Sequence, residues 1–387
     1  MSAKLRIPKP HPMNPHERFM LLALSIAPLG RGWTSPNPIV GAVVVKGGKV
    51  VGTGFHEKYG GPHAEVHALR EAGKAAKGGT LFCTLEPCNH HGKTPPCVDA
   101  ILAAGIKTVV YAASDPNKIA AGGARALKKK KVAVIGGVLA EEAWAQNAPF
   151  FKRVGTGLPF VTAKWAMSAD GKIATRARDS KWITGPKARA YAHHLRATHD
   201  AVLIGIGTVL SDAPLLTARL GLKDPEHNNW QPRRVILDSQ ARTPLDAPLW
   251  TAENGGPVTI AVSSDAPIER VKQLKDKGAE IINVLSEDGR LPVREVLKGL
   301  AKLGVMSILV EGGAEVLGSF LDAKVVDRTC AFIAPKILGG RDSISAVRGT
   351  GVKKISDCLE MHSVRTESFP PDILIEGKLG AWDWLKT

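Results

Sequence analysis

The feature that most restricts the fold of this chain is a set of three metal-binding side chains: His63, in His63-Ala64-Glu65, together with Cys88 and Cys97, which each follow a proline. An imidazole and two thiolates are good ligands for a tetrahedral zinc ion, and they leave the fourth position for water, as in catalytic zinc sites. Two thiolates also cancel the charge of the ion, and each lies at a predicted helix start, where unpaired N–H groups favour a thiolate. The fold must therefore bring three distant points of the sequence together.

Glu65 adds a proton acceptor to this set. It lies two residues after His63 in the same predicted helical turn, so it can reach the water without being a ligand. A carboxylate there can take a proton from the water and pass it to a leaving amine, as hydrolytic deamination requires. The order His-x-Glu, Pro-Cys, Cys is the zinc deaminase signature, in which activated water attacks an amino-bearing ring carbon. We therefore predict that Glu65 is a catalytic residue.

A purely structural zinc site is the alternative interpretation. Such a site needs a fourth protein ligand, which the sequence offers nearby at His67, His90, His91 or Cys83. Cys83 lies in the middle of a predicted strand, where a cysteine is more often part of the core. The histidine pair lies in the segment that joins the two cysteine ligands.

The length of 387 residues exceeds what one compact core usually accommodates, so we expect two domains. The hydrophobic fraction of 44% and the charged fraction of 23% exclude a disordered or collagen-like chain. Charge is unusual, because 52 Lys and Arg against 36 Asp and Glu leave a net charge of +16. This excess favours a phosphorylated or polyanionic partner. The lysine run Lys128–Lys131 is interpreted as a solvated helix end.

Five cysteines, an odd and low number for this length, argue against a disulfide framework and for a reducing compartment. No apolar run approaches the ~18 residues of a membrane helix. The segment Met1–Pro12 is basic and proline-rich but lacks the apolar core of a secretory signal, so we predict a frayed tail. We therefore expect a cytoplasmic protein that does not bind a membrane.

Residues 1–150 are predicted to form the first domain. Asn14-Pro15 is an N-cap followed by proline at the first helical position, and it predicts a helix that Gly30 closes. Gly47-Gly48 between two β-branched runs predicts a hairpin. Strands and helices then alternate, which is typical of a sheet covered by helices on both faces. The predicted elements are strands at Val40–Val45, Lys49–Thr53, Thr80–Leu85 and Lys107–Ala112 and helices at His63–Ala76 and Cys97–Ala104.

Residues 151–387 are predicted to form a second α/β domain, after a polar linker at Lys152–Gly157. Glycines follow the predicted strands at Ala201–Ile204 and Ser307–Val310, and such turns let backbone N–H groups approach a pyrophosphate, although they also occur as packing turns. Further strands are predicted at Phe160–Trp165, Arg234–Leu237, Val258–Val262, Ile281–Val284 and Thr329–Ile333, and helices at Pro186–Arg196, Leu291–Leu303 and Ala314–Leu321.

The segment Thr84–Cys97 closely resembles the family of bifunctional riboflavin-biosynthesis proteins, in which a pyrimidine deaminase is fused to a reductase. Eight residues separate its two cysteines, whereas most zinc deaminases have two there, so the match is specific. The resemblance implies a cytidine-deaminase-like three-layer αβα fold for the first domain. It also implies that the substrate pocket is lined by Asn37, His56, His90 and Lys93.

Residues from about 160 to 375 resemble the reductase half of the same family, whose fold is similar to dihydrofolate reductase and whose cofactor is NADPH. The motifs that match include Ser168–Ala174, Ser180–Thr184, Gly205–Val209, Ser211–Pro214 and Val310–Gly313. The resemblance implies that NADPH contacts Ala166, Trp182, Thr208, Asp212, Ser239, Gly313, Ala314, Glu315, Val316, Leu317, Gly318 and Ser319. It implies that the substrate contacts Ser180, Arg196, Leu216, Arg219 and Glu311.

Three charged residues of the second half suit a sugar phosphate. Arg196 and Arg219 have the fork geometry of a phosphate clamp. Lys164, in an otherwise apolar predicted strand, is predicted as a catalytic residue that holds the sugar, the alternative being a lysine that extends its amine to solvent.

The chain departs from the family pattern at a few positions. Lys118 and Ala124 replace a usual proline and glycine after Asp115-Pro116-Asn117, Ala169 replaces leucine, and Ala213 replaces Asp or Asn. Arg178 stands where glycine is common, and it can alter a loop over the reductase pocket.

The residues alone indicate a zinc deaminase joined to an α/β domain, and the resemblance implies a two-step riboflavin-pathway enzyme. Zinc-dependent deamination of a small phosphorylated pyrimidine would precede NADPH-dependent reduction of its ribosyl group. We expect a homo-oligomer and no nucleic-acid partner. Three other functions stay open at this point: a nucleic-acid deaminase of the tRNA-editing type, a reductase with an inactive deaminase domain, and a zinc-stapled binding protein.

Overall fold

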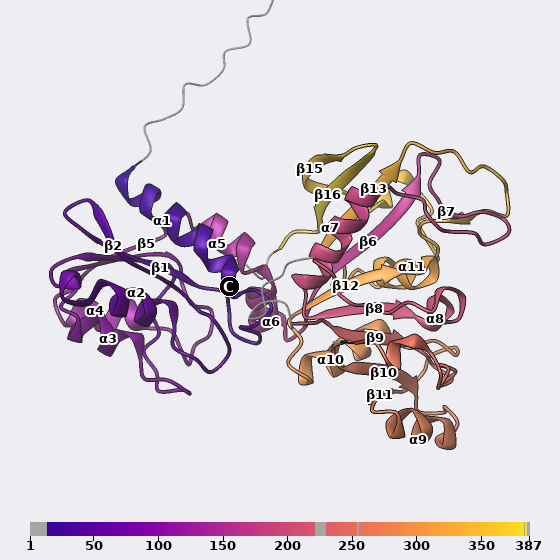
Figure 1. Ribbon diagram of the computed structural model, residues 1–387, viewed down its shortest axis with the longest axis horizontal. Coiled ribbons are helices and arrows are strands. Elements are labelled where there is room, and N and C mark those ends of the chain that lie inside the picture. Colours follow the sequence, from indigo (N-terminus) through magenta and orange to yellow (C-terminus); the bar gives the residue numbers. More distant parts are fainter. Residues whose placement is uncertain (1–13, 221–229, 254, 383, 385–387) are drawn as a thin grey trace, which may run out of the picture. The chain divides into compact units, whose positions relative to one another are not determined.

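The structure is a computed structural model that describes residues 14–220, 230–253, 255–382 and 384. It divides into two compact units, Met1–Asn147 and Ala148–Thr387 (Figure 1). The tail Met1–Pro12, which the sequence predicts to be frayed, lies outside the described residues. Among the residues that are described, no helix is both long and apolar enough to cross a membrane.

A five-stranded sheet forms the centre of the first unit, with the strand order β2-β1-β3-β4-β5. Strand β1 is antiparallel to both of its neighbours, β2 and β3, whereas β3, β4 and β5 are parallel to each other. Gly47 and Gly48 form the β1–β2 turn with φ of 56° and 75°, which only glycine adopts without strain. The strands are β1 (Gly41–Lys46), β2 (Lys49–Phe55), β3 (Thr80–Leu85), β4 (Thr108–Ala113) and β5 (Ala133–Gly136).

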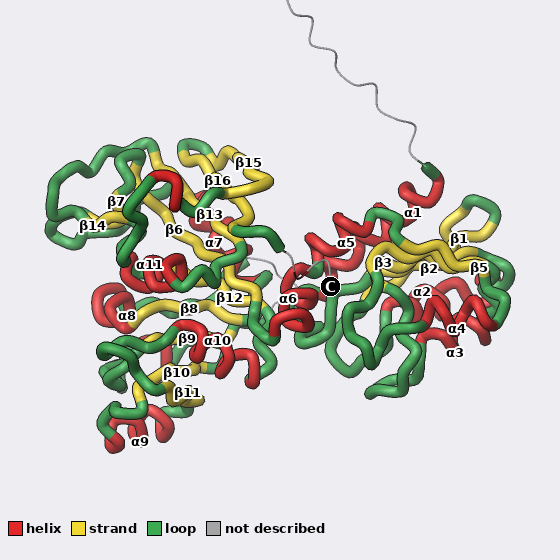
Figure 2. The backbone as a smooth tube through the Cα atoms, turned by 180° about the vertical axis from the view of Figure 1, so that it is seen from behind, coloured by secondary structure: helices red, strands yellow, loops and turns green. Residues whose placement is uncertain are grey.

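Helices cover both faces of this sheet, so the predicted three-layer αβα architecture is confirmed. Helices α1 and α5 lie on one face, and α2, α3 and α4 lie on the other (Figures 1 and 2). The N-terminus of α1 is capped as predicted, because the Asn14 side chain accepts a hydrogen bond from the His16 N–H while Glu17 accepts one from the Asn14 N–H. The helices are α1 (Pro15–Ile26), α2 (Ala64–Ala72), α3 (Cys97–Ala103), α4 (Gly123–Lys129) and α5 (Ala140–Gln146).

The second unit is built on a nine-stranded sheet with the order β11-β10-β9-β8-β12-β6-β13-β16-β15. The strands from β11 to β13 are parallel, and β16 and β15 add an antiparallel hairpin. The chain runs outward from β8 (Ala201–Gly205) to β11 (Glu280–Val284) and returns to insert β12 (Ser307–Gly312) between β8 and β6 (Phe160–Ser168). The carboxyl ends of these central strands meet at one edge, where open α/β sheets bind their ligands.

Apolar residues alternate between the two faces of this sheet. In β8, Val202 and Ile204 belong to a core cluster that includes Leu195 of α7 and Leu274 of α9, whereas Ala201 and Leu203 belong to one that includes residues of α10 and α11. The other elements of this unit are α6 (Ala148–Thr156), β7 (Lys172–Ala174), α7 (Pro186–Ala197), α8 (Ile206–Asp212), β9 (Arg233–Leu237), β10 (Val258–Ser263), α9 (Ile268–Asp276), α10 (Val293–Lys302), α11 (Ala314–Asp322), β13 (Arg328–Ala334), β14 (Ile344–Ser345), β15 (Met361–Phe369) and β16 (Asp372–Leu379).

The segment Lys152–Gly157 is not a linker, so that prediction is wrong. It lies mostly within helix α6, where Lys152 is buried and forms an ion pair with Asp327. The Asp327 carboxylate also accepts a hydrogen bond from the Val161 N–H at 2.7 Å. The partner of Lys152 is far away in the sequence, so local polarity alone indicated an exposed connection.

Every strand and helix predicted from the sequence is present in the structure. The sequence did not predict α5, α6, α8, α9, β5, β7, β14, β15 or β16, and it indicated α4 only as the helix end at Lys128–Lys131. Seven of the nine residues of β15 are exposed, so its sequence carries no alternation of buried and exposed positions.

Candidate functional site

The three predicted metal ligands meet at the carboxyl end of β3. Among the described residues, His63, Cys88 and Cys97 form a group whose ligand atoms all lie within 4.8 Å of one another. His63 is the N-cap of α2 and Cys97 is the first residue of α3, so two helix starts face the loop that carries Cys88. The His63 Nδ1 atom lies 3.2 Å from the Cys97 Sγ atom and 3.4 Å from the Cys88 Sγ atom. The two sulfurs therefore share one imidazole nitrogen.

The charges in this group favour a bound dication. Hydrogen bonds from Cys97 and His63 lower the pKa of Cys88 to about 4, although burial opposes this shift. The Cys88 sulfur beside it and burial raise the pKa of Cys97 well above its usual value. The first thiolate thus forms readily and the second does not. A zinc ion bound to both sulfurs would neutralise their charges and so stabilise both thiolates. The donor set therefore fits the metal.

Two of the four residues considered as a fourth protein ligand, His67 and Cys83, lie beside other polar groups. His67 Nδ1 lies 3.7 Å from a Glu57 carboxylate oxygen. The Cys83 thiol is fully buried in β3 and lies 3.8 Å from the Val110 carbonyl oxygen. Neither belongs to the cluster of ligand atoms found among the described residues. The arrangement favours three protein ligands and an open fourth position.

Glu65 lies in the first turn of α2, directly beside the metal group. Its side chain is almost fully buried, with 3% exposure, and burial raises the pKa of its carboxyl group above the usual value. The His63 charge partly opposes this shift. A carboxyl group with a raised pKa exchanges protons more readily near neutral pH, as a proton shuttle requires.

A chain of hydrogen bonds joins the predicted pocket residues Asn37 and His56 to the metal group. His56 Nδ1 lies 3.0 Å from the Pro62 carbonyl oxygen, to which it must donate, so His56 Nε2 accepts from the Asn37 amide at 3.2 Å. Burial lowers the pKa of His56, which favours this neutral ring. The His56 ring packs edge-on against His63 at 5.3 Å between centroids. Both predicted side chains therefore lie beside the metal ligands.

His90 and Lys93 lie in the loop between the two cysteine ligands. His90 is half-buried and its Nδ1 atom is buried without a hydrogen-bond partner, whereas Lys93 is exposed. The Lys93 amine lies 4.1 Å from the centroid of the Tyr59 ring. This loop carries two donors that remain available to a ligand.

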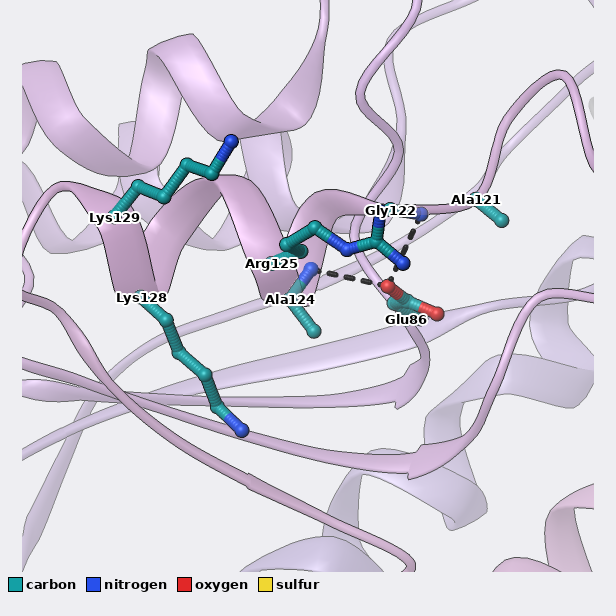
Figure 3. Close-up of a pocket in the computed structure, with 7 residues that line it drawn as sticks. All are labelled: Glu86, Ala121, Gly122, Ala124, Arg125, Lys128 and Lys129. Atoms are coloured by element: carbon teal, nitrogen blue, oxygen red, sulfur yellow. Dashed lines mark hydrogen bonds between the residues drawn. The ribbon is translucent and has the colours of Figure 1, made fainter.

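A hollow of about 740 Å³ lies beside α4 rather than at the metal group (Figure 3). Glu86 lies at this hollow, and its Oε1 atom accepts hydrogen bonds from the N–H groups of Gly122 at 3.2 Å and Ala124 at 3.0 Å. Glu86 thereby ties the start of α4 to the strand that leads into Cys88. The rest of the lining is Ala121, Arg125, Lys128 and Lys129.

The second unit contains a cavity of about 260 Å³ that collects five of the predicted reductase residues: Lys164, Ala166, Trp182, Arg196 and Arg219. The sequence did not single out the other residues that line it. Among them, Arg189 lies over the Trp182 ring, with 4.5 Å from its guanidinium carbon to the ring centroid. Only the fold brings α7, β6 and β13 to one pocket. The additional lining residues are Thr184, Ala188, Arg189, Ala192, His193 and Phe332.

Arg196 is bound within the protein. Its Nε and Nη2 atoms donate to the two carboxylate oxygens of Glu311 at 2.7 and 2.8 Å, and its Nη1 atom donates to the Thr217 carbonyl oxygen at 3.1 Å. Burial alone would raise the pKa of Glu311, but Arg196 and Lys164 lower it to about 2. Burial lowers the pKa of Lys164, whose amine lies 5.8 Å from the centroid of the Phe332 ring.

Arg219 lies nearby and donates hydrogen bonds to Thr217 and His193. Its Nη1 atom donates to the Thr217 hydroxyl at 2.9 Å, and its Nη2 atom donates to His193 Nε2 at 3.1 Å. Burial and the charges of Arg196 and Arg219 lower the pKa of His193 to about 4, so its ring is neutral and donates from Nδ1 to the Thr217 carbonyl. Two of the five N–H groups of the Arg219 guanidinium make the bonds to Thr217 and His193, and Arg219 lines the cavity as a cation.

Nine of the twelve predicted cofactor residues, Thr208, Asp212 and Gly313–Ser319, lie in the turns and helices that directly follow β8 and β12. A Cβ atom at Gly205 would lie 2.7 Å from the Val316 side chain, and one at Gly313 would lie 3.5 Å from the Thr208 hydroxyl, so the two glycine turns adjoin. Helix α8, which carries Thr208 and Asp212, and helix α11, which carries Ala314–Ser319, both begin at this edge. Adjacent helix starts with exposed N–H groups suit a pyrophosphate.

Three further predicted residues lie in loops. Ser239 follows the end of β9, and its carbonyl oxygen accepts the Ser263 N–H at 3.0 Å. Leu216 is buried with φ of 56°, and Ser180 is half-buried in the segment before α7. None of the three lines the cavity that contains Lys164.

Residues 13–113 match the family described as cytidine and deoxycytidylate deaminase zinc-binding region, and residues 159–375 match the RibD C-terminal domain. The chain is 40% identical over 360 residues to the riboflavin biosynthesis protein RibD of Actinobacillus pleuropneumoniae, covering 92% of this chain and 94% of the relative. It is 42% identical over 360 residues to RibD of Aquifex aeolicus, covering 93% and 97% of the two chains.

Solved structures agree with these matches. A structure of Acinetobacter baumannii RibD superposes with a TM-score of 0.85 at 35% identity and covers 95% of this chain and 99% of that one. A Thermotoga maritima protein described as a diaminohydroxyphosphoribosylaminopyrimidine deaminase and 5-amino-6-(5-phosphoribosylamino)uracil reductase superposes with a TM-score of 0.81 at 37% identity, covering 95% and 99%.

Proposed function

The chain belongs to the RibD family of riboflavin-biosynthesis proteins, with a deaminase and a reductase domain, and on that premise we propose its substrate and the roles of its residues. The first unit removes the 2-amino group of 2,5-diamino-6-ribosylamino-4(3H)-pyrimidinone 5′-phosphate by hydrolysis. The second unit reduces the ribosyl group of the product to a ribityl group with NADPH. The names of both activities in the Thermotoga maritima relative support this pair of substrates.

In the deaminase pocket, His63, Cys88 and Cys97 hold zinc, which when bound activates water for attack. The Glu65 carboxylate accepts a proton from that water at one of its oxygens. It then delivers the proton to the leaving amino nitrogen, so that a C–O bond forms at C2 of the ring, the C–N bond breaks and ammonia leaves. The raised pKa of Glu65 supports this double role, because the residue must both hold and release the proton.

Asn37 and His56 orient the pyrimidine ring. The Asn37 Nδ2 group donates to His56, so the Asn37 Oδ1 atom can accept hydrogen bonds from the N–H groups of the pyrimidine ring. His90 and Lys93 add donors from the neighbouring loop, and Lys93 supplies a positive charge for the ribose phosphate. Because several fixed groups hold the ring in the reactive orientation, less entropy is lost when the transition state forms.

In the reductase domain, NADPH occupies the adjoining glycine turns at the ends of β8 and β12, and when bound it supplies the hydride. Gly313, Thr208, Asp212 and residues Ala314–Ser319 would contact the cofactor, and the backbone N–H groups of the glycine turn would meet its phosphates. Ala166 and Trp182 line the cavity, and Ser239 lies beyond β9. The reaction adds hydride to C1′ of the sugar and a proton to the ring oxygen as the C1′–O4′ bond breaks. The ribosyl group thereby becomes ribityl.

Arg219 binds the substrate phosphate in the reductase cavity, with Arg196 as part of the wall. The positive charge of Arg219 and its place in the cavity lining support this assignment. Lys164 and the Arg196–Glu311 pair lie where they can contact the sugar and the ring. Ser180 and Leu216 contribute from the surrounding loops.

One observation carries the deaminase assignment: Glu65, nearly fully buried, lies in the helical turn that follows the ligand His63 and beside Cys97. The test is to incubate purified zinc-loaded protein with the phosphorylated diaminopyrimidine and to follow ammonia release and NADPH oxidation separately. Ammonia should appear without NADPH, and NADPH oxidation should depend on the deaminated product. NADPH oxidation without ammonia release would favour a reductase with an inactive deaminase domain.

The protein is further proposed to act in the cytoplasm as a homo-oligomer, as the low cysteine content and the family resemblance suggest. The +16 charge leaves a nucleic-acid deaminase as the second candidate. Tight RNA binding that weakens steeply with salt, together with deamination of RNA, would favour that candidate instead.

A further inference from the structure

Asn147, the last residue of the first unit, pairs its side-chain amide with the backbone of Ile39. The Asn147 Oδ1 atom accepts the Ile39 N–H at 3.0 Å, and the Asn147 Nδ2 atom donates to the Ile39 carbonyl oxygen at 2.9 Å. Asn147 is 3% exposed, and its own N–H donates to the Ala143 carbonyl at the end of α5. One buried amide thus fixes both polar groups of a residue more than a hundred positions earlier in the chain.

Ile39 lies inside the segment that supports the deaminase pocket. Asn37 is two residues before it, flanked by Pro36 and Pro38, which have no N–H groups to anchor that stretch. Val40 follows Ile39 and accepts the His56 N–H at 2.9 Å. The segment that Asn147 binds therefore carries the pocket residue Asn37. The same segment also accepts the backbone N–H of the second pocket residue, His56, directly after β2.

His56 continues this path to the metal group. Its Nδ1 atom meets the carbonyl oxygen of Pro62, the residue directly before the ligand His63, and its Nε2 atom meets the Asn37 amide. Asn147, Ile39, Asn37 and His56 thus form one connected chain of bonds that ends beside His63. Asn147 itself has both side-chain groups bound to Ile39, so it contacts the pocket only through this path.

We propose that Asn147 is a positioning residue of the deaminase, whose two hydrogen bonds to Ile39 hold residues 37–40 so that Asn37 and His56 meet the pyrimidine ring in register. The inference rests on the proposed deaminase function. An amide is the side chain that offers one donor and one acceptor side by side, which matches the N–H and carbonyl of a single peptide residue. Replacing it by an apolar group leaves both Ile39 groups buried without partners.

The test uses the full zinc-loaded chain with Asn147→Leu, which keeps the branched shape of the side chain and removes both hydrogen bonds. Deaminase kcat/KM per bound zinc should fall by roughly tenfold or more, mainly through a higher KM, since small displacements of positioning groups weaken productive binding strongly. NADPH-dependent reduction of 5-amino-6-(5-phosphoribosylamino)uracil should be unchanged. Asn147→Asp keeps the acceptor for the Ile39 N–H and should retain intermediate activity, and it serves if the leucine variant does not fold.

Gln146→Leu is the matched control. Gln146 lies next to Asn147 at the end of α5, and its Nε2 atom donates to the Leu24 carbonyl at 2.9 Å, in α1 rather than in the pocket segment. This variant should lower thermal stability while leaving deaminase KM and kcat unchanged. Equal kinetic losses in the two variants would mean that Asn147 acts only through stability and would overturn the proposal.

A double-mutant cycle with Asn37→Ala separates positioning from general damage. If Asn147 acts through Asn37, the loss caused by Asn147→Leu should shrink when Asn37 is already truncated. The proposal would be overturned if the double variant lost activity by the product of the two single-variant losses, or if Asn147→Leu had wild-type kinetics. A wild-type chain that releases no ammonia would instead refute the proposed deaminase function, and this inference with it.

Discussion

Arg196 holds Glu311 through two parallel hydrogen bonds, from Nε to Oε1 at 2.7 Å and from Nη2 to Oε2 at 2.8 Å. Such a bidentate pair, in which both side chains are largely buried, is strong and directional. The phosphate clamp that the sequence predicts for Arg196 and Arg219 stays a prediction, and we propose Arg219 as its main phosphate contact because Arg196 is paired with Glu311. The Arg196–Glu311 pair joins α7 to β12 and shapes the wall of the cavity.

Arg219→Gln should raise the reductase KM for the phosphorylated substrate by roughly tenfold, the scale of one charge-assisted hydrogen bond, and should change the KM for a dephosphorylated analogue little. Arg196→Gln should impair both substrates alike, because it leaves Glu311 without its partner. Steady-state kinetics with both substrates measure the difference. Equal losses for the two substrates in Arg219→Gln would exclude Arg219 as the phosphate contact.

Glu65→Gln should lower the deamination rate by roughly 10²-fold or more, which is the scale of a lost proton shuttle. Zinc content and NADPH-dependent reduction of the deaminated product should stay normal, since the glutamine keeps the shape of the buried side chain. Ammonia release and metal analysis on the same preparation measure both. Near-normal ammonia release would contradict the role of Glu65.

Removal of zinc with a chelator should abolish deamination and leave the reductase step intact, because the metal-binding group lies wholly in the first unit. His63→Ala should have the same effect permanently, because its Nδ1 atom faces both ligand sulfurs. Ammonia release before and after zinc is restored is the measurement. Unchanged zinc content in His63→Ala would refute its ligand role.

The stability of the reductase domain should depend on the ionisation of Glu311. Its pKa falls from an ordinary 4.5 to about 2 in the folded protein. A carboxyl group with a lowered folded pKa stabilises the fold above the unfolded value and loses this effect as the pH falls through the folded value. The difference in free energy of unfolding between wild type and Glu311→Gln should therefore be largest above pH 4.5 and shrink towards pH 2. Urea denaturation across this range measures it, and a constant difference would contradict the pairing.

Lys152→Met should destabilise the second unit by about 3–5 kcal/mol, because it leaves the buried Asp327 carboxylate without its counter-charge. Adding Asp327→Asn should recover part of this loss, since the amide oxygen can still accept the Val161 N–H. Urea denaturation of the single and double variants measures both steps. No recovery in the double variant would mean that the ion pair is not the source of the loss.

The features that could be predicted from the sequence depend on residues close to one another in the chain. Asn14 and Glu17 cap a helix within a few residues, Gly47-Gly48 turn a hairpin, and a short continuous run of apolar residues marks a buried strand such as Ala201–Gly205. The zinc signature is readable for the same reason, because Cys88 and Cys97 carry their chemistry in their identity and their short spacing.

Prediction from the sequence was wrong or missing where a residue's role depends on a partner far away in the chain. Lys152 appeared to belong to an exposed linker because Asp327, which neutralises it, lies in a distant part of the sequence. His193 and Arg189 carried no signal, although both line the cavity with Arg219, because α7 meets β6 and β13 only after the sheet forms.

The sequence by itself determined the two α/β units, the metal ligands and Glu65, since these depend on residue type and near neighbours. Tertiary structure alone decided that Arg196 is engaged by Glu311, that Arg219 lines the cavity, and that Asn147 binds the backbone of Ile39 near Asn37. The physical reason is that hydrogen-bond donors and buried charges take their roles from the partners within about 3 Å of them, and the fold chooses those partners from anywhere in the chain.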